Sequence, residues 1–194
     1  KITDQAGLDN ARKDYHLPER FIFFLGNTDP KKNTANVLKA FALYKQKYND
    51  NLYLVMPDYD ESALQELLRQ TVKPEIRSHI VMTGYVPNEE LPYIINQCVL
   101  MLYPSLRESF GIPILEGMAC GVPVITSNSS SMPEIAGDAA LMVEPSDPND
   151  ILRAVEQVIN DPDQAAVLSE KGIQRARQFS WDKMAEAYIA LYKE

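Results

Sequence analysis

The chain has 194 residues, of which 27 are Asp or Glu and 19 are Lys or Arg, so its formal net charge is −8 at pH 7. A chain of this length can form one domain with a sizeable core, since it buries about 70% of the surface that its unfolded form exposes. The acidic balance argues against a nucleic-acid partner, because binding to a phosphate backbone relies on a dense Lys and Arg surface.

The first 19 residues are polar and mixed in charge, and this stretch resembles a linker, with one amphipathic hint in Leu8, Ala11 and Leu17. From there on, short apolar runs alternate with helical patterns, and we expect one domain over residues 20–194. Such alternation indicates a parallel sheet that helices cover on both faces. Six runs are predicted as strands: Arg20–Leu25, Asn51–Met56, Ile80–Met82, Val99–Tyr103, Val122–Thr126 and Leu141–Val143.

Helical periodicity is visible between these runs. Val37, Phe41, Tyr44 and Tyr48 recur at helical spacing, and residues 62–72 carry a second apolar face. Three later helix starts are marked by a capping residue before a helix-starting residue, namely Asp147-Pro148, Asp161-Pro162 and Ser180-Trp181. The end of the chain is therefore predicted to be helical.

The last predicted helix carries an apolar stripe formed by Trp181, Met184, Tyr188 and Tyr192. A stripe of this kind is more typical of ordinary packing, and a surface for a partner is the alternative.

Six parallel strands joined by right-handed crossovers most often adopt the order 3-2-1-4-5-6. We therefore predict an α/β fold, a Rossmann-like, doubly wound sheet of six parallel strands in this order. The first and fourth strands then lie side by side at the switch point, where ligands bind. The loop Gly26–Asn33 after the first strand should face the loop Pro104–Gly111 after the fourth.

Both loops lead into predicted helices, whose positive ends favour a bound anion such as a diphosphate. Lys32, just before the expected helix cap, is the better candidate for binding phosphate, while Lys31 is expected to be solvated. Pro113 suits the first position of the second helix, so that free backbone amides just before it can face the anion. Taken alone, the loop at Gly26 also fits a plain turn between a strand and a helix.

Two carboxylates bracket the start of the second helix. Glu108 lies in the loop and Glu116 is expected in the first helical turn, so the two acids are not expected to share a proton and each can bind a different hydroxyl group. The alternative is a pair of solvated surface acids, which the setting at the switch point disfavours. The arrangement is suited to holding a sugar nucleotide.

The two cysteines and the two histidines show no metal-binding pattern. Cys98 and Cys120 each stand beside apolar residues, and neither has the spacing of a metal ligand, which indicates buried thiols in a reducing compartment. We therefore expect a cytoplasmic protein without a metal site. The longest apolar run, Cys98–Tyr103, is far shorter than the ~20 residues of a membrane helix, and we expect a soluble chain.

Residues 20–192 resemble the C-terminal, nucleotide-sugar-binding half of the retaining GT-B glycosyltransferases of family 4, or group 1. The strongest element is the paired-glutamate motif Glu108-Ser-Phe-Gly-Ile-Pro-Ile-Leu-Glu116, followed by Gly117-Met-Ala-Cys-Gly-Val-Pro-Val-Ile125. Supporting elements are Thr83-Gly-Tyr-Val86, Ser131-Met-Pro-Glu134 and Phe179-Ser-Trp181.

The resemblance implies a role for each motif residue. Glu108 would lie by the transferred sugar as the catalytic residue, and Glu116 would bind the ribose hydroxyls. Lys32 and the backbone amides around Phe110, Gly111 and Ile112 would hold the distal phosphate, next to the loop of Gly26 and Asn27. Tyr85 and Val86 match the segment that borders the base.

Two positions depart from the pattern of the family. Asn27 stands where members commonly have a phosphate-binding arginine, so the positive charge rests on Lys32 with help from Lys31 or Arg107. The glycine that often follows the second strand is replaced by Met56-Pro57-Asp58.

By this resemblance the chain is the donor-binding half of a hexosyltransferase-like enzyme that uses a UDP- or GDP-linked sugar, with no cofactor and no metal ion. The acceptor half would precede it, and we expect the isolated domain to be inactive and to meet a membrane only through that half. The final helix would cross back to the acceptor half, which would leave Trp181, Tyr188 and Tyr192 exposed here. Such enzymes are often bacterial and build surface polysaccharide. The alternatives are a non-catalytic nucleotide-sugar-binding domain and a nucleotide-sugar epimerase.

Overall fold

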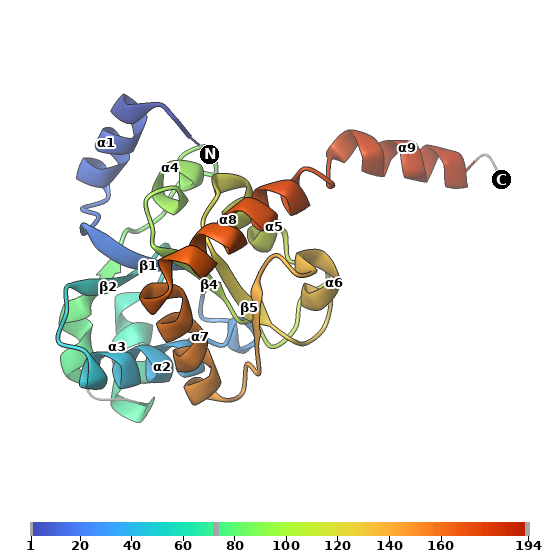
Figure 1. Ribbon diagram of the computed structural model, residues 1–194. Coiled ribbons are helices and arrows are strands. Elements are labelled where there is room, and N and C mark those ends of the chain that lie inside the picture. Colours follow the sequence, from blue (N-terminus) through green and yellow to red (C-terminus); the bar gives the residue numbers. More distant parts are fainter. Residues whose placement is uncertain (1, 72–73, 193–194) are drawn as a thin grey trace.

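The computed structural model describes residues 2–71 and 74–192 and contains a six-stranded sheet whose pairings are all parallel (Figure 1). The strand order is β3-β2-β1-β4-β5-β6, so the predicted order is confirmed. Ile22 at the centre of the sheet pairs with Leu54 on one side and with Leu100 on the other. The strands are β1 Arg20–Phe24, β2 Leu52–Met56, β3 Ile80–Met82, β4 Leu100–Tyr103, β5 Val124–Ser127 and β6 Leu141–Val143.

Helices follow the strands along the chain. The side chains of Asp147, Asp161 and Ser180 each accept a hydrogen bond from a backbone N–H of the first turn, so the three predicted caps are confirmed. The helices are α1 Gln5–Asp14, α2 Thr34–Lys47, α3 Glu61–Thr71, α4 Leu91–Ile95, α5 Ile112–Cys120, α6 Met132–Ala136, α7 Pro148–Asn160, α8 Pro162–Ala176 and α9 Trp181–Leu191, with the 3₁₀ turns η1 Pro30–Lys32 and η2 Pro74–His79.

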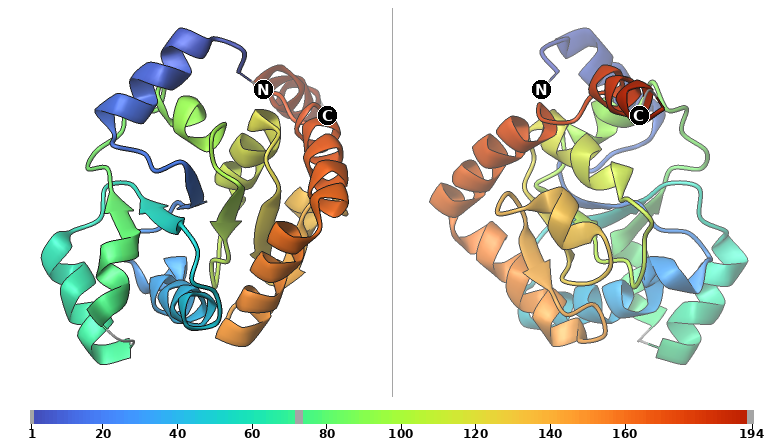
Figure 2. Two further views of the ribbon diagram at one scale, coloured as in Figure 1. Left: turned by 60° about the vertical axis from the view of Figure 1, so that its left-hand side comes forward. Right: turned by 90° about the vertical axis from the view of Figure 1, so that its right-hand side faces the viewer.

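The sheet is buried on both faces, which explains why its strands are continuous apolar runs. Ile22 and Phe24 of β1 belong to the core under α2, α3 and α7, whereas Phe21 and Phe23 belong to the core under α4, α5 and α6. Figure 2 shows from two further sides how these helices flank the strands. The alternation of side chains along one buried strand therefore fixes both layers.

The segment interpreted as linker-like contains a helix. Asp4 caps α1, and Gln97, two residues after α4, donates a hydrogen bond to the backbone oxygen of Leu8 and accepts one from Arg12, at 3.0 Å each. The helix is stabilised by contacts with a distant part of the chain, and its own sequence has only a weak helical pattern. This explains why the local sequence does not predict it. Residues 1, 72–73 and 193–194 lie outside the described residues. The first residue of the predicted segment 1–19, the last two of the predicted domain 20–194 and the last residue of the predicted helix 62–72 therefore lie outside them too.

Helix α9 extends away from the rest of the chain (Figure 1). The aromatic side chains of the predicted stripe are open to solvent, with exposed fractions of 73% for Trp181 and 56% for Tyr188 in α9 and 85% for Tyr192 directly after it. Ordinary packing within this chain is therefore the wrong interpretation of the stripe, and the exposure expected from the resemblance is observed.

Within residues 2–71 and 74–192, none of the helices has both the length and the apolar character needed to cross a bilayer.

The close approach of α5 to the sheet depends on Gly117. A Cβ atom at this position would lie 2.7 Å from Met101 Sδ and 2.9 Å from Val124 Cγ2. We expect Gly117→Val to lower the free energy of unfolding by at least about 2 kcal/mol, because overpacking forces strand and helix apart. Urea unfolding measures the change. Gly172→Ala is the control, since its Cβ would lie 3.1 Å from Met118 Cγ and 3.4 Å from Met118 Cα, which are looser contacts than those at Gly117. An equal loss of stability in both variants would contradict the account.

Candidate functional site

The loops that follow β1 and β4 are fastened to each other at the carboxyl edge of the sheet. The backbone N–H of Leu106 donates to the backbone oxygen of Lys31 at 2.7 Å. The buried amide of Asn33 donates to the backbone oxygens of Pro104 at 2.9 Å and Pro145 at 2.7 Å. Asn33 has a φ of 64°, a left-handed conformation that Asn tolerates better than most residues. One side chain therefore links three loops.

A cavity of about 400 Å³ opens beside this junction. Its walls come from the segments after β1, β2 and β3 and from the first turns of α5, which is where a doubly wound sheet binds its ligands. The lining residues are Leu25, Gly26, Asn27, Lys32, Pro57, Asp58, Tyr85, Val86, Asn88, Leu91, Ile112, Pro113 and Glu116.

Lys32, Glu108 and Tyr103 form a closed triangle of hydrogen bonds next to the cavity. Lys32 Nζ donates to Glu108 Oε1 at 2.7 Å and to the Tyr103 hydroxyl at 2.8 Å, and that hydroxyl donates to the same Oε1 at 2.8 Å. Burial of the Glu108 carboxyl raises its pKa, but the hydrogen bonds from Lys32 and Tyr103 outweigh burial and leave the pKa below its ordinary value. Glu108 is therefore ionised at neutral pH.

Glu116 is in the opposite electrostatic setting. It faces the cavity from α5, and among the described residues its carboxylate has no hydrogen-bond or ion-pair partner. The residue is exposed, and partial desolvation by the surrounding protein still raises the pKa of its carboxyl. Its two oxygens are therefore free to accept hydrogen bonds from a ligand.

The loop that carries Glu108 is held from outside by serines of the segment after β5. Ser130 Oγ donates to the backbone oxygen of Glu108 at 2.6 Å, and Ser131 Oγ donates to that of Phe110 at 2.9 Å. Ser129 Oγ donates in the same way to the backbone oxygen of Leu106 at 3.1 Å. These contacts turn a surface loop into a fixed support for the carboxylate.

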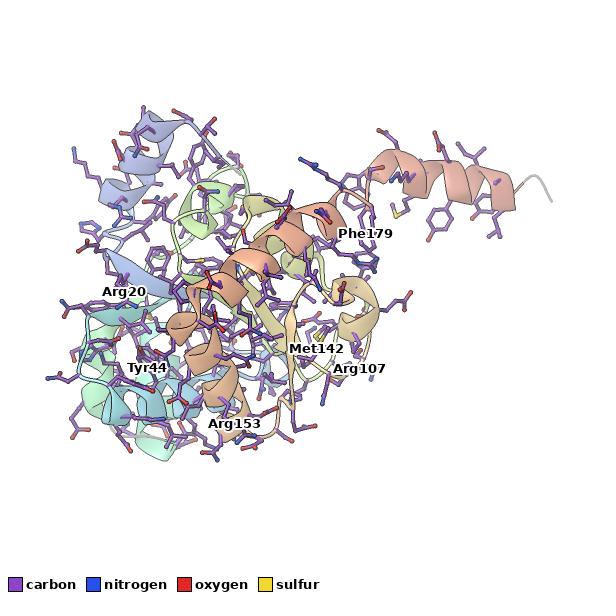
Figure 3. The ribbon with its side chains drawn as sticks, in the orientation of Figure 1. Arg20, Tyr44, Arg107, Met142, Arg153 and Phe179 are labelled. Carbon is purple, nitrogen blue, oxygen red and sulfur yellow. The ribbon has the colours of Figure 1, made fainter. Side chains whose placement is uncertain are left out.

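The start of α5 presents backbone donors. Gly111 caps the helix with a φ of 99°, a conformation that favours glycine. Within the described part of the chain, the N–H groups of Phe110 and Gly111 make no hydrogen bond to protein. The Phe110 ring packs edge-on against Phe179, labelled in Figure 3, with the ring centroids 6.1 Å apart. This contact joins the loop to the segment before α9.

Helix α5 begins at Ile112, so Pro113 is its second residue and not its first. Glu116 is consequently the fifth residue of α5, and the prediction that it lies in the first helical turn is wrong. Gly111, in a left-handed conformation, is the cap residue that precedes the helix.

The structure brings most of the predicted site residues together. The cavity is lined by Gly26, Asn27, Lys32, Tyr85, Val86, Ile112 and Glu116. Glu108 does not line it and joins it through Lys32, while Phe110 and Gly111 lie in the adjoining loop.

Sequence reasoning missed several contributors. Tyr103 ends an apolar strand in the sequence pattern, and the signal for its role is a hydroxyl at the carboxyl end of a central strand. Asn33 and Asn88 are polar loop residues that no sequence motif distinguishes from surface asparagines. Asp58, at the position where the family glycine is missing, has a φ of 47° and lines the cavity, so it adopts a backbone conformation that glycine adopts readily.

The other two cations considered for the phosphate lie apart from the cavity lining. Lys31 pairs with Asp29 at 3.1 Å and is exposed. Arg107 lies on the exposed surface of its loop (Figure 3). Over residues 2–71 and 74–192, no group of three or more His, Cys, Asp and Glu side chains is arranged to hold a metal ion.

A family model described as "Glycosyl transferases group 1" matches residues 9–175. The chain belongs to this family. O-antigen chain mannosyltransferase B of Escherichia coli is 34% identical over 176 residues, which cover 89% of this chain and 45% of that protein. The chain thus spans less than half the length of curated relatives such as mannosyltransferase B and the serotype-specific mannosyltransferase WbdA of Escherichia coli.

Solved structures of glycosyltransferases share the fold. HepE of Anabaena, solved with UDP and glucose, is 16% identical with a TM-score of 0.82, over 99% of this chain and 53% of that one. The C-terminal domain of the group 1 protein LpcC from Francisella tularensis is 22% identical with a TM-score of 0.74, over 87% of this chain and 90% of that one. The GT-B assignment is therefore confirmed for this group 1 glycosyltransferase domain.

Asn33 generates a prediction on stability. We expect Asn33→Ala to lower the free energy of unfolding by about 2–4 kcal/mol, because the oxygen of Pro104 loses its donor and alanine is strained at positive φ. Denaturant unfolding of the two proteins measures the difference. Asn36→Ala is the matched control, since Asn36 contacts Pro145 in the same network at 3.2 Å without the left-handed backbone; an equal loss there would contradict the role of Asn33.

Glu116 generates a prediction on pH. Because its pKa is raised in the folded chain, the stability linked to its proton is complete below the unfolded pKa and is lost as pH rises through the folded pKa. Glu116→Gln removes this loss, so the variant should melt at a higher temperature than the parent at pH 7, and the two should converge as pH falls to about 4. Thermal scans across pH measure the gap. Glu144→Gln is the control, because the pKa of the Glu144 carboxyl is lowered instead of raised. A Glu116→Gln variant that is less stable than the parent at pH 7 would contradict a raised pKa at Glu116.

Proposed function

We propose that this chain is the donor-binding part of a retaining glycosyltransferase that moves a hexose from a UDP- or GDP-linked sugar to an acceptor. The observation that carries the proposal is the convergence of the unpartnered Glu116 carboxylate and Lys32 on one cavity at the switch point of the sheet. Membership of the glycosyltransferase family supports it, as does the printed description of HepE as a complex with UDP and glucose.

The nucleoside end of the donor is assigned to the side of the cavity that holds Glu116, Tyr85 and Val86. An ionised carboxylate with two free oxygens is suited to accept paired hydrogen bonds from the ribose diol. Tyr85, whose side chain is 73% exposed at the rim, offers a ring on which the base can stack. The buried Val86 supplies apolar contact below it.

The diphosphate is assigned to the junction of the two loops. Lys32 brings a cation, and the N–H groups of Phe110, Gly111 and Ile112 lie at the positive end of α5. As the bond to the sugar breaks, negative charge builds on the departing diphosphate, and fixed donors of this kind stabilise it.

Glu108 is assigned to the transferred sugar. Its carboxylate is ionised and accepts a hydrogen bond from Lys32, the proposed ligand of the distal phosphate, which supports a place for Glu108 beside the sugar attached to that phosphate. There it can accept hydrogen bonds from sugar hydroxyls and offset the positive charge that develops on the sugar ring. Attack from the face that the diphosphate leaves would retain the anomeric configuration.

We propose that the acceptor binds to a further part of the protein. The match to mannosyltransferase B covers 45% of that enzyme, which leaves room for such a part. The chain as described here would then bind donor without transferring it. The O-antigen chain mannosyltransferase B among its relatives favours a role in surface polysaccharide synthesis with a mannosyl donor.

Binding of nucleoside diphosphates tests the proposal. Titration calorimetry with GDP, UDP and ADP should give binding for at least one, and Glu116→Ala and Lys32→Met should each weaken it about 10-fold or more, since hydrogen bonds to charged groups are worth about 1.5–3 kcal/mol. Affinity should also fall with decreasing pH as Glu116 takes up its proton.

Lys31→Met is the matched control, because Lys31 pairs with Asp29 outside the cavity lining. The proposal fails if no nucleoside diphosphate binds, or if Lys31→Met weakens binding as much as Lys32→Met does.

A further inference from the structure

Tyr103 is almost completely buried, with 1% of its surface exposed, yet its hydroxyl is fully engaged in the triangle beside the cavity. A tyrosine at the end of an apolar strand could satisfy its hydroxyl with a backbone oxygen. Here it binds two charged side chains from two different loops, one after β1 and one after β4.

The triangle also restrains the direction in which Lys32 points. An ammonium group has three N–H donors, and two of these are used by Tyr103 and Glu108. The ammonium also lies 4.9 Å from the centroid of the Tyr103 ring, within the range of a cation–π interaction. One donor is left for a ligand, and Lys32 lines the cavity.

We propose that Tyr103 is a positioning residue that holds the Lys32 ammonium and the Glu108 carboxylate in the relative orientation needed at the diphosphate and the transferred sugar. Without this hydroxyl, Lys32 keeps the Glu108 carboxylate as its one hydrogen-bond partner among the described residues, and lysine is a long chain with many rotamers. Preorganisation by Tyr103 removes the entropy that a ligand would otherwise have to overcome to fix Lys32. This inference rests on the proposed donor site. It adds Tyr103 as the residue that fixes the orientation of Lys32 and Glu108 in that site.

Tyr103→Phe is the direct test, because it removes the hydroxyl and keeps the buried ring. Calorimetry with the nucleoside diphosphate that the parent chain binds should show a loss of about 3- to 10-fold, the range of one hydrogen bond to charged groups. Affinity for the matching nucleoside monophosphate should be unchanged, since it lacks the distal phosphate that Lys32 is proposed to bind.

A double variant separates positioning from general damage to the fold. If Tyr103 acts through Lys32, adding Tyr103→Phe to Lys32→Met should change diphosphate affinity by less than about 2-fold. Additive losses in the double variant, or an equal loss of monophosphate affinity, would overturn the proposal. Tyr44→Phe is the matched control, since Tyr44 is equally buried and its hydroxyl donates to Asp50 at 2.8 Å outside the cavity lining.

A second measurement does not depend on any nucleotide. The Tyr103 hydroxyl is one of the donors that keep the pKa of Glu108 low, and Lys32 is the cation paired with that carboxylate. NMR titration of ¹³C-labelled glutamate carboxyls should show the pKa of Glu108 higher in Tyr103→Phe than in the parent and unchanged in Tyr44→Phe. An unchanged pKa of Glu108 in Tyr103→Phe would overturn this inference, whether or not donor binding is found. Absence of diphosphate binding to the parent chain would instead count against the proposed function.

Discussion

The junction between the loops after β1 and β4 is the constraint on which the rest of the site depends. The strand order reverses between these neighbours, so their following segments leave the sheet in different directions and open a crevice. The backbone hydrogen bond from Leu106 to Lys31 and the amide of Asn33 hold the two segments together. Because the segments are held together, Lys32 and Glu108, which are distant in sequence, meet as an ion pair.

The two carboxylates of the motif have opposite electrostatic environments, and this contrast suits them to different roles in the site. Glu108 is paired and its pKa is lowered, whereas Glu116 is unpartnered and its pKa is raised. A carboxylate that faces a cavity without a partner and has a raised pKa is typical of a position kept for a ligand. The same reasoning explains why Glu108, held by Lys32 and Tyr103, is suited to a fixed role beside the reacting bond.

Most of the fold could be predicted from the hydrophobic pattern of the sequence, because the strands are apolar runs and the segments between them show helical periodicity. The strand at Val124–Ser127 begins two residues later than predicted, after Pro123, which has no N–H to give to a ladder. Helix α1 could not be predicted in the same way, since contacts with α4 stabilise it and its own sequence is polar. At the site, the strand order predicted which loops meet. The role of the Tyr103 hydroxyl could not be predicted in this way, because Tyr103 belongs to an apolar run that the pattern assigns to the core.

The most direct test of the central claim is a crystal structure of this chain with a bound nucleoside diphosphate. The account predicts the ribose hydroxyls on the Glu116 carboxylate and a distal phosphate oxygen within hydrogen-bond distance of Lys32 Nζ, with Tyr103 still bonded to Glu108. A nucleotide bound elsewhere on the domain, or one that leaves both Lys32 and Glu116 without a contact, would contradict it.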